Sequence, residues 1–383
     1  MKNQKLRIAV LYGGRSGEHE ISLVSATSII QHLDRSQFDV IPIGIDKQGG
    51  WFLGDDVFLK GLESKKILQL QADNERLLFD PDSIGKSLRD ISPASFSTSF
   101  PTDRLFDVVF PAIHGTSCED GVVQGLLELS NVPYVGCGVL SSAVGMDKDV
   151  SKRLAVAANV AVSPYHAIKK GQWERNETIL CEQIIRHLRF PVFVKPANTG
   201  SSVGVRKVHS SNQLASAISQ AFEYDTKVVV EQGIDAIELE VAVLESLNNG
   251  EDPIVSVVGE VRPSSAHEFY SYAAKYLDEK GAELMIPAEI PTDLQIKAQQ
   301  VAKHIFLALD CEGMARVDLF LDRHTHEIYF NEINTIPGFT SSSMYPKMIM
   351  ASGIPYSELL THLIKLAMQR HARKNCLKRD YSA

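Results

Sequence analysis

ARVDLFLD (residues 315–322) and IYFNEINTIPG (residues 328–338) are two apolar runs, close in sequence, that are typical of neighbouring β-strands. Alternate residues of a strand face the same side of its sheet, so polar groups two positions apart project together. Each run carries one such pair among mostly apolar residues. The pairs are Arg316 with Asp318 on the first strand and Glu332 with Asn334 on the second.

Polar groups inside apolar strands need partners, because a buried charge without one is costly. The oxygen donors found here, without histidine or cysteine, suit Mg²⁺ ions that carry phosphate groups. They predict Asp318, Glu332 and Asn334 as metal ligands. The alternative is an ion pair between Arg316 and the carboxylates that only holds the sheet together. The asparagine and the glycine turn after the second strand favour the metal site.

A turn rich in glycine and serine, residues 196–204 (PANTGSSVG), follows a third apolar run and predicts a phosphate loop. Small residues let backbone N–H groups approach an anion closely, and Ser201 and Ser202 add hydroxyl donors. Lys195, just before the turn, and Lys148 supply charges suited to polyphosphate. No Gly-Lys-Ser/Thr ends the turn, so it is not a Walker A loop. Taken alone, it is equally compatible with an ordinary β-turn.

Two further carboxylates are candidates for binding the rest of a nucleotide. Glu231 ends an apolar run at 227–231, and Glu238 lies in the next run at 237–244. Carboxylates there can accept hydrogen bonds from an adenine amine and a ribose hydroxyl. Together with the lysines and the metal ligands, these positions predict ATP as a co-substrate.

A glycine turn near the N-terminus, Gly13-Gly14-x-x-Gly17, follows the apolar run 6–12 but lacks the spacing of a dinucleotide-binding fingerprint. Glu18 stands in the first turn of the helix that follows. A helix N-terminus attracts anions, but a carboxylate already there would repel a pyrophosphate, which disfavours a nicotinamide dehydrogenase. Glu18 is therefore predicted to bind a substrate ammonium. The alternative is a residue that only stabilises the helix dipole.

The composition fits a globular enzyme. Of 383 residues, 44% are hydrophobic and 22% are charged, a mixture that supports two or three domains. The net charge of −8 argues against nucleic acid and anionic membranes as partners. No apolar run approaches the ~20 residues needed to span a bilayer, and the first run is too short for a signal peptide. Five cysteines without C-x-x-C spacing indicate a reducing compartment, so we expect a cytoplasmic protein.

The order of the apolar runs predicts a combined α/β and α+β fold. We expect an N-terminal α/β domain (1–139), a small central α+β domain (140–230) and a larger C-terminal domain (231–383). Residues 48–100 are interpreted as an elaboration without a chemical signature, and the polar stretch 262–283 has no clear period.

Local signals also predict where helices begin. Capping boxes at Ser210-x-x-Gln213 and Thr292-x-x-Gln295 are expected to open two helices. A third helix is expected to run without a break through Met146-Asp147-Lys148 and past Arg153.

Taken together, these residues resemble one family closely, D-alanine–D-alanine ligase of the ATP-grasp superfamily. The similarity covers nearly the whole chain, with several long motifs in the right order. The motifs are GGRSGEHEISL (13–23), HGTSCEDGVVQGLLEL (114–129), MDKDVSKRLA (146–155), VKPANTGSSVGV (194–205), FYSYAAKYLD (269–278), and ARVDLFLD with NEINTIPGFTSSSMYP (331–346).

The resemblance implies an ATP-grasp fold that clasps ATP and two Mg²⁺ (or Mn²⁺) ions. It also implies a homodimer that joins two D-alanine molecules through an acyl phosphate, and a lid near 262–283. The positions that match the family are ATP contacts at Lys148, Lys195, Glu231 and Glu238, with Ser202 and Lys275 beside them; metal ligands at Asp318, Glu332 and Asn334; and substrate or catalytic positions at Glu18, His114, Ser201, Tyr276, Arg316, Gly338 and Ser343.

Two positions bear on specificity. Tyr276 stands where relatives that accept D-lactate tend to carry histidine, so we expect the dipeptide product. Cys118 stands where many relatives carry glycine. The remaining alternatives are a D-alanine–D-lactate ligase and a non-catalytic ATP-binding module.

Overall fold

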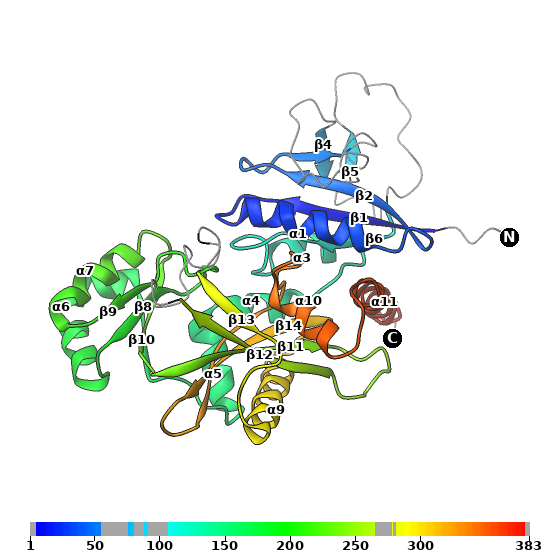
Figure 1. Ribbon diagram of the computed structural model, residues 1–383. Coiled ribbons are helices and arrows are strands. Elements are labelled where there is room, and N and C mark those ends of the chain that lie inside the picture. Colours follow the sequence, from blue (N-terminus) through cyan, green and yellow to red (C-terminus); the bar gives the residue numbers. More distant parts are fainter. Residues whose placement is uncertain are drawn as a thin grey trace.

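The computed structural model describes residues 5–54, 76–79, 88–90, 106–264, 278 and 281–379. In this part of the chain the strands form three sheets that follow one another along the sequence (Figure 1). One sheet has a parallel centre flanked by helices, and the other two are antiparallel, which agrees with the predicted α/β and α+β class. No helix within these ranges combines the length and the hydropathy needed to cross a membrane.

The first sheet is built around β1 (Leu6–Gly13), which lies between β2 (Phe38–Ile45) and β6 (Val108–Pro111) and is parallel to both. The strand is a continuous apolar run because a central parallel strand is covered on both faces. Helix α1 (His19–His32) packs on β1 and leads to β2. Described parts of the 48–100 elaboration extend the sheet with β3 (Trp51–Leu53), β4 (Arg76–Phe79) and β5 (Leu88–Asp90).

The second sheet has the strand order β7-β10-β8-β9, with each neighbouring pair antiparallel. Helices α6 and α7 pack on it around a small apolar core. The elements are α6 (Lys170–His187), α7 (Ser211–Ala221), β7 (Tyr165–Lys169), β8 (Val192–Pro196), β9 (Arg206–Val208) and β10 (Lys227–Gln232), preceded by α3 (Val122–Leu129), α4 (Val139–Met146) and α5 (Lys148–Ala157).

The third sheet has the order β13-β12-β11-β14-β15 and carries helices on both faces. Alternation along β11 directs Val241 and Val243 toward α9, and Ala242 and Leu244 toward α10. The elements are α9 (Thr292–Ala308), α10 (Met344–Ala351), β11 (Ala236–Leu244), β12 (Ile254–Pro263), β13 (Ala282–Met285), β14 (Met314–Asp322) and β15 (Ile328–Asn334).

The continuous helix predicted through residues 146–153 is wrong. Asp147 has extended backbone angles, φ −81° and ψ 104°, so α4 ends before it and α5 begins after it. Its carboxylate accepts hydrogen bonds from the backbone N–H groups of Asp149 and Val150 and so caps α5. Because of this break, Lys148 is the first residue of α5.

The two helices begin where they were predicted, α7 directly after Ser210 and α9 at Thr292, but neither predicted capping box forms. Ser210 is the N-cap residue of α7, but its side chain makes no capping hydrogen bond to the helix. Pro291, and not Thr292, is the N-cap residue of α9, and the Gln295 side chain donates to the carbonyl oxygens of Ala288 and Ile290.

Helix α11 (Tyr356–Asn375) returns to the first sheet, where it packs against α1 and β6 (Figure 1). Arg370 of this helix is 5% exposed and lies 4.3 Å from the centre of the Tyr134 ring. It donates to the backbone carbonyl oxygens of Tyr134 at 2.7 Å and Gly136 at 2.6 Å. Because buried carbonyl groups need hydrogen-bond donors, the Arg370 side chain holds α11 against residues 134–136.

Arg370→Met is expected to lower the free energy of unfolding by about 2 to 4 kcal/mol, because two buried carbonyl groups lose their donor while the aliphatic packing remains. Urea denaturation measures the change. Arg373→Met is the matched control, since Arg373 lies on the same helix and its side chain is 39% exposed. The control should change stability by less than about 0.5 kcal/mol, and equal losses in both variants would contradict the fastening role.

Candidate active site

Strands β14 and β15 bring the four predicted polar side chains together. In their antiparallel register Arg316 pairs with Asn334, and Asp318 pairs with Glu332. Arg316 donates to both oxygens of Asp318, from Nε at 2.7 Å and from Nη2 at 2.8 Å. Nδ2 of Asn334 donates to Oδ2 of Asp318 at 3.0 Å. The side chains therefore meet on one face, where strand alternation predicts them.

A bulge in β15 adds a residue that alternation alone would direct to the opposite face. Asp318 pairs with Glu332 but Leu319 pairs with Phe330, so Asn331 is left out of the pairing. Asn331 and Glu332, although adjacent in sequence, both line the same cavity. Oδ1 of Asn331 accepts a hydrogen bond from Lys195 Nζ at 3.2 Å, and no signal in the sequence marks this residue.

Arg316 also faces a third carboxylate, Glu240 of β11, with Nε 3.0 Å from Oε2. Desolvation lowers the pKa of Arg316, but the charges of Asp318 and Glu240 outweigh it and raise that pKa well above the usual value. The ion pair considered as the alternative to a metal site is thus present. Glu332 forms an ion pair of its own with Lys148 Nζ at 3.4 Å.

Three lysines approach the cavity from the second sheet and from α5. Lys148 donates to the carbonyl oxygen of Thr199 at 2.7 Å, and Lys195 donates to Oε2 of Glu231 at 2.6 Å. Lys152 is fully buried, with Nζ 3.0 Å from Oε1 of Glu231 and 2.9 Å from the Asn331 carbonyl oxygen. Sequence reasoning missed Lys152, although it stands four residues after Lys148 on the same face of a helix.

Glu231 is 2% exposed and lies between Lys152 and Lys195. Burial raises the pKa of its carboxyl group, but the two lysines outweigh burial and lower the pKa to about 2. Desolvation lowers the pKa of Lys152 despite the attraction of Glu231. The Glu231 carboxylate therefore holds two lysines in place, in addition to lining the cavity where adenine contacts are predicted.

The predicted phosphate loop folds back toward Glu18. Ser201 and Ser202 adopt left-handed backbone angles, with φ of 50° and 58°, and the Ser201 hydroxyl donates to the Glu18 carboxylate. A Cβ atom at Gly200 would lie 2.9 Å from Oε2 of Glu18, and one at Gly115 would lie 2.8 Å from the same oxygen. Glycine at these positions is what lets two loops close around Glu18.

His114 is 4% exposed, and both of its ring nitrogens have partners within the protein. Nδ1 lies 3.1 Å from Oε1 of Glu119, and Nε2 lies 2.9 Å from the Ser25 hydroxyl. Desolvation lowers the pKa of His114, but the hydrogen bond and the charge of Glu119 outweigh it and raise the pKa. Sequence reasoning predicted His114 near the substrates and missed Ser25 and Glu119.

The turn after β15 holds the remaining predicted positions. A Cβ atom at Gly338 would lie 2.7 Å from the Ser343 hydroxyl, so these two residues adjoin. Oγ of Ser343 accepts a hydrogen bond from the Thr340 N–H at 3.0 Å.

Two predicted site residues, Lys275 and Tyr276, lie outside the described residues. Cys118 is 3% exposed and is packed behind Gly14.

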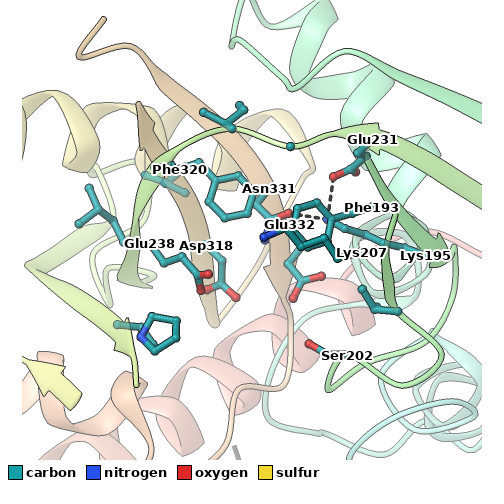
Figure 2. Close-up of a pocket in the computed structure, with 18 of the residues that line it drawn as sticks. Phe193, Lys195, Ser202, Lys207, Glu231, Glu238, Asp318, Phe320, Asn331 and Glu332 are labelled. Carbon is teal, nitrogen blue, oxygen red and sulfur yellow. Dashed lines mark hydrogen bonds and ion pairs between the residues drawn. The ribbon is translucent and has the colours of Figure 1, made fainter. Parts of the chain in front are cut away.

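A cavity of about 850 Å³ lies between the second and third sheets. Figure 2 shows Glu238 and Asp318 at one side of it and Lys195 and Glu231 at the other, with Glu332 between them. Glu18, His114, Gly338 and Ser343 are not among the lining residues and form a neighbouring cluster. Predicted residues that line the cavity are Lys148, Lys195, Ser202, Glu231, Glu238, Asp318 and Glu332.

The donor set beside the cavity fits a hard divalent cation. Asp318 and Glu332 offer carboxylate oxygens, and Asn334 offers its amide oxygen because its amide nitrogen donates to Asp318. Within the described ranges, no group of three or more His, Cys, Asp or Glu residues is arranged to hold a metal by itself. Phosphate oxygens and water would therefore complete the coordination.

Glu231→Gln is expected to lower the free energy of unfolding at neutral pH, because two buried lysines lose their counter-charge. The folded-state pKa of Glu231 is lowered to about 2, so its contribution is full above the unfolded pKa near 4.5 and is lost as pH falls through the folded value. Urea unfolding from pH 7 to pH 3 should show the wild-type advantage shrinking below about pH 4.5. Glu174→Gln, at an exposed glutamate on α6, should show no such trend. A pH-independent difference for Glu231→Gln would contradict the assigned charge.

The family models described as D-ala D-ala ligase N-terminus and C-terminus match residues 7–137 and 154–365. The chain is 49% identical to D-alanine–D-alanine ligase A of Bradyrhizobium diazoefficiens, over 99% of both chains. It is 44% identical to D-alanine–D-alanine ligase A of Escherichia coli K12, over 98% of this chain and 99% of that one.

Two solved structures extend the similarity to the fold. The D-alanine–D-alanine ligase of Coxiella burnetii is 35% identical with a TM-score of 0.79, covering 97% of this chain and 96% of its own. The VanG D-Ala:D-Ser ligase of Enterococcus faecalis is 35% identical with a TM-score of 0.80, covering 95% and 100%. The fold is that of the ATP-grasp enzymes, and the resemblance noted in the sequence is confirmed: the chain belongs to the D-alanine–D-alanine ligase family.

Proposed function

We propose that this chain joins two D-alanine molecules to D-alanyl-D-alanine, with ATP held by two Mg²⁺ ions at Asp318, Glu332 and Asn334. As a member of its family it is an ATP-dependent, ADP-forming ligase that supplies a peptidoglycan precursor. The observation that supports the assigned residues best is the meeting of oxygen donors and lysines around one cavity, beside the Glu18 cluster.

In the first step, a carboxylate oxygen of one D-alanine attacks the γ-phosphorus of ATP, the bond to the β,γ-bridging oxygen breaks, ADP leaves and an acyl phosphate forms. Lys148 and Lys195 neutralise charge on the phosphates, and their ion pairs with Glu332 and Glu231 hold them in place beforehand. Bound Mg²⁺ would supply charge neutralisation and orientation at the transferring phosphate. Glu18, with Ser201 donating to it, binds the ammonium of this first D-alanine.

In the second step, the amine of another D-alanine attacks the acyl carbon and phosphate leaves. Arg316, kept charged by two carboxylates, and the backbone N–H of Gly338 stabilise the oxyanion that forms. Ser343 binds the carboxylate of the second substrate. Lys275 and Tyr276 belong to a lid that excludes water, which would otherwise hydrolyse the acyl phosphate.

The remaining assignments follow the family. We propose that the enzyme works in the cytoplasm as a homodimer, and that Mn²⁺ can replace Mg²⁺, because both accept oxygen donors in octahedral geometry.

The second substrate is the point at which related ligases differ, since one solved relative is a D-Ala:D-Ser ligase. Tyr276 stands where relatives that accept D-lactate tend to carry histidine, and tyrosine cannot become cationic; we propose D-alanine as the second substrate on that basis. Product formation from D-alanine alone, with D-serine and with D-lactate separates the three activities. A mixed product formed faster than D-alanyl-D-alanine would overturn this choice.

Glu332→Gln is expected to lower kcat/KM for ligation by at least about 100-fold and to raise the Mg²⁺ concentration needed for half-maximal activity, because a metal ligand loses its charge. Phosphate release with D-alanine measures the effect, and L-alanine should give no release with the wild type. The control is Glu327→Gln, an exposed glutamate before β15. Undiminished activity of Glu332→Gln would remove the metal assignment, and equal turnover of both enantiomers would remove the substrate assignment.

A further inference from the structure

The direction in which the backbone N–H of Gly338 points is not set by Gly338 itself. Glycine has the widest conformational freedom of any residue, so the direction of its N–H must be set by its neighbours. A side chain at this position would displace the Ser343 hydroxyl, because a Cβ atom would lie 2.7 Å from it. An oxyanion donor placed 1 Å away from its proper position loses much of its effect. The residues that hold this turn in position therefore affect how well the Gly338 N–H can stabilise the oxyanion.

Phe339, the next residue, is anchored from three directions. Its ring is 1% exposed and packs edge-on against Phe110, with ring centres 5.8 Å apart, and also near Tyr345 at 5.7 Å. Its carbonyl oxygen accepts a hydrogen bond from the Tyr356 hydroxyl at 2.9 Å. Its N–H donates to the Ser25 hydroxyl at 3.3 Å. The Phe339 N–H belongs to the peptide group that follows Gly338, and holding it limits the backbone angles with which Gly338 presents its own N–H.

A line of buried polar groups continues from Ser25. Its hydroxyl lies 2.9 Å from Nε2 of His114, and Nδ1 of His114 lies 3.1 Å from Glu119. The line crosses from the turn after β15 through α1 to the loop after β6, so it joins segments more than 200 residues apart in sequence. Because the Glu119 carboxylate can only accept, Nδ1 of His114 donates to it, and the Ser25 hydroxyl can donate to Nε2 while accepting from the Phe339 N–H.

Burial makes this arrangement costly unless every member is satisfied. Ser25 is fully buried, and His114 and Glu119 are 4% and 9% exposed. Apolar residues would fill the same space without the cost of desolvating a carboxylate and an imidazole. The line of hydrogen bonds ends at the backbone N–H of Phe339, directly after Gly338. A role in holding this backbone explains why Ser25, His114 and Glu119 are polar although they are buried.

We propose that Glu119, His114 and Ser25 form a positioning relay that fixes Phe339 and thereby aims the Gly338 N–H at the oxyanion of the amine-capture step. The three are positioning residues, because they act through the backbone of the 338–339 turn. The relay rests on the proposed function of Gly338. It serves the second step of the reaction and leaves phosphoryl transfer to the lysines and the metal ligands.

Ser25→Ala tests the relay, since it removes one oxygen and leaves the space nearly unchanged. Dipeptide formation is expected to fall about 10- to 100-fold, with KM for ATP unchanged within about twofold. Scrambling of the β,γ-bridge oxygen of labelled ATP in the presence of D-alanine reports reversible acyl phosphate formation. Relative to net turnover, scrambling should rise, because the acyl phosphate waits longer for capture. A parallel fall of scrambling and turnover, or no change in either, would overturn the relay.

Two further variants complete the design. Glu119→Gln should raise the same ratio to a smaller extent, and it decides the question if Ser25→Ala melts at a much lower temperature than the wild type. Ser130→Ala is the matched control: Ser130 is also fully buried, but its hydroxyl donates to a carbonyl of α3. It should leave the ratio unchanged. A wild type that forms no D-alanyl-D-alanine from D-alanine and ATP would overturn the proposed function itself, which distinguishes that failure from a failure of the relay.

Discussion

Arg316 lies between Asp318 and Glu240 on the central strands of the third sheet, and the chemistry of the cavity depends on this buried charge balance. The charges of these two carboxylates raise the pKa of the Arg316 guanidinium well above its usual value, although desolvation lowers it. On the facing side, Glu231 lies between Lys152 and Lys195, and the two lysines outweigh burial and lower the pKa of Glu231 to about 2. Carboxylates thus gather around Arg316 on one side of the cavity and lysines gather around Glu231 on the other, an arrangement that suits a metal-bound polyphosphate.

The sheet supplies the geometry for this balance. Antiparallel pairing places Asp318 opposite Glu332, and the bulge at Asn331 lets two adjacent residues of β15 line the cavity. A regular strand would direct one of them into the core below. The Asn331 side chain joins the third sheet to the second through Lys195, and its carbonyl oxygen joins the third sheet to α5 through Lys152. The bulge in β15 thus connects the second and third sheets, which lie on opposite sides of the cavity.

Strand alternation was enough to predict that Arg316, Asp318, Glu332 and Asn334 share a face, because a period of two is a local property of the chain. It could not reveal Glu240, Lys152 or Asn331. Glu240 and Lys152 come from other elements, and a bulge depends on the partner strand. The unbroken helix at Asp147 was wrong because the N-cap role of this aspartate, itself a local signal, was missed. The capping boxes did not form because the side chains of Ser210 and Gln295 bond to other groups. The division into domains at residues 139 and 230 stays a prediction.

The return of α11 to the first sheet has a consequence for how the protein is made. Leu359, Leu363 and Ile364 belong to the same apolar core as Ile8 and Val10, and Arg370 fastens this helix to residues 134–136. During synthesis the first sheet leaves the ribosome long before the segment that completes its core. Until α11 emerges, the apolar residues of the first sheet that it covers stay exposed to solvent. The core of the first sheet therefore cannot be completed while the chain is still being synthesised up to α11.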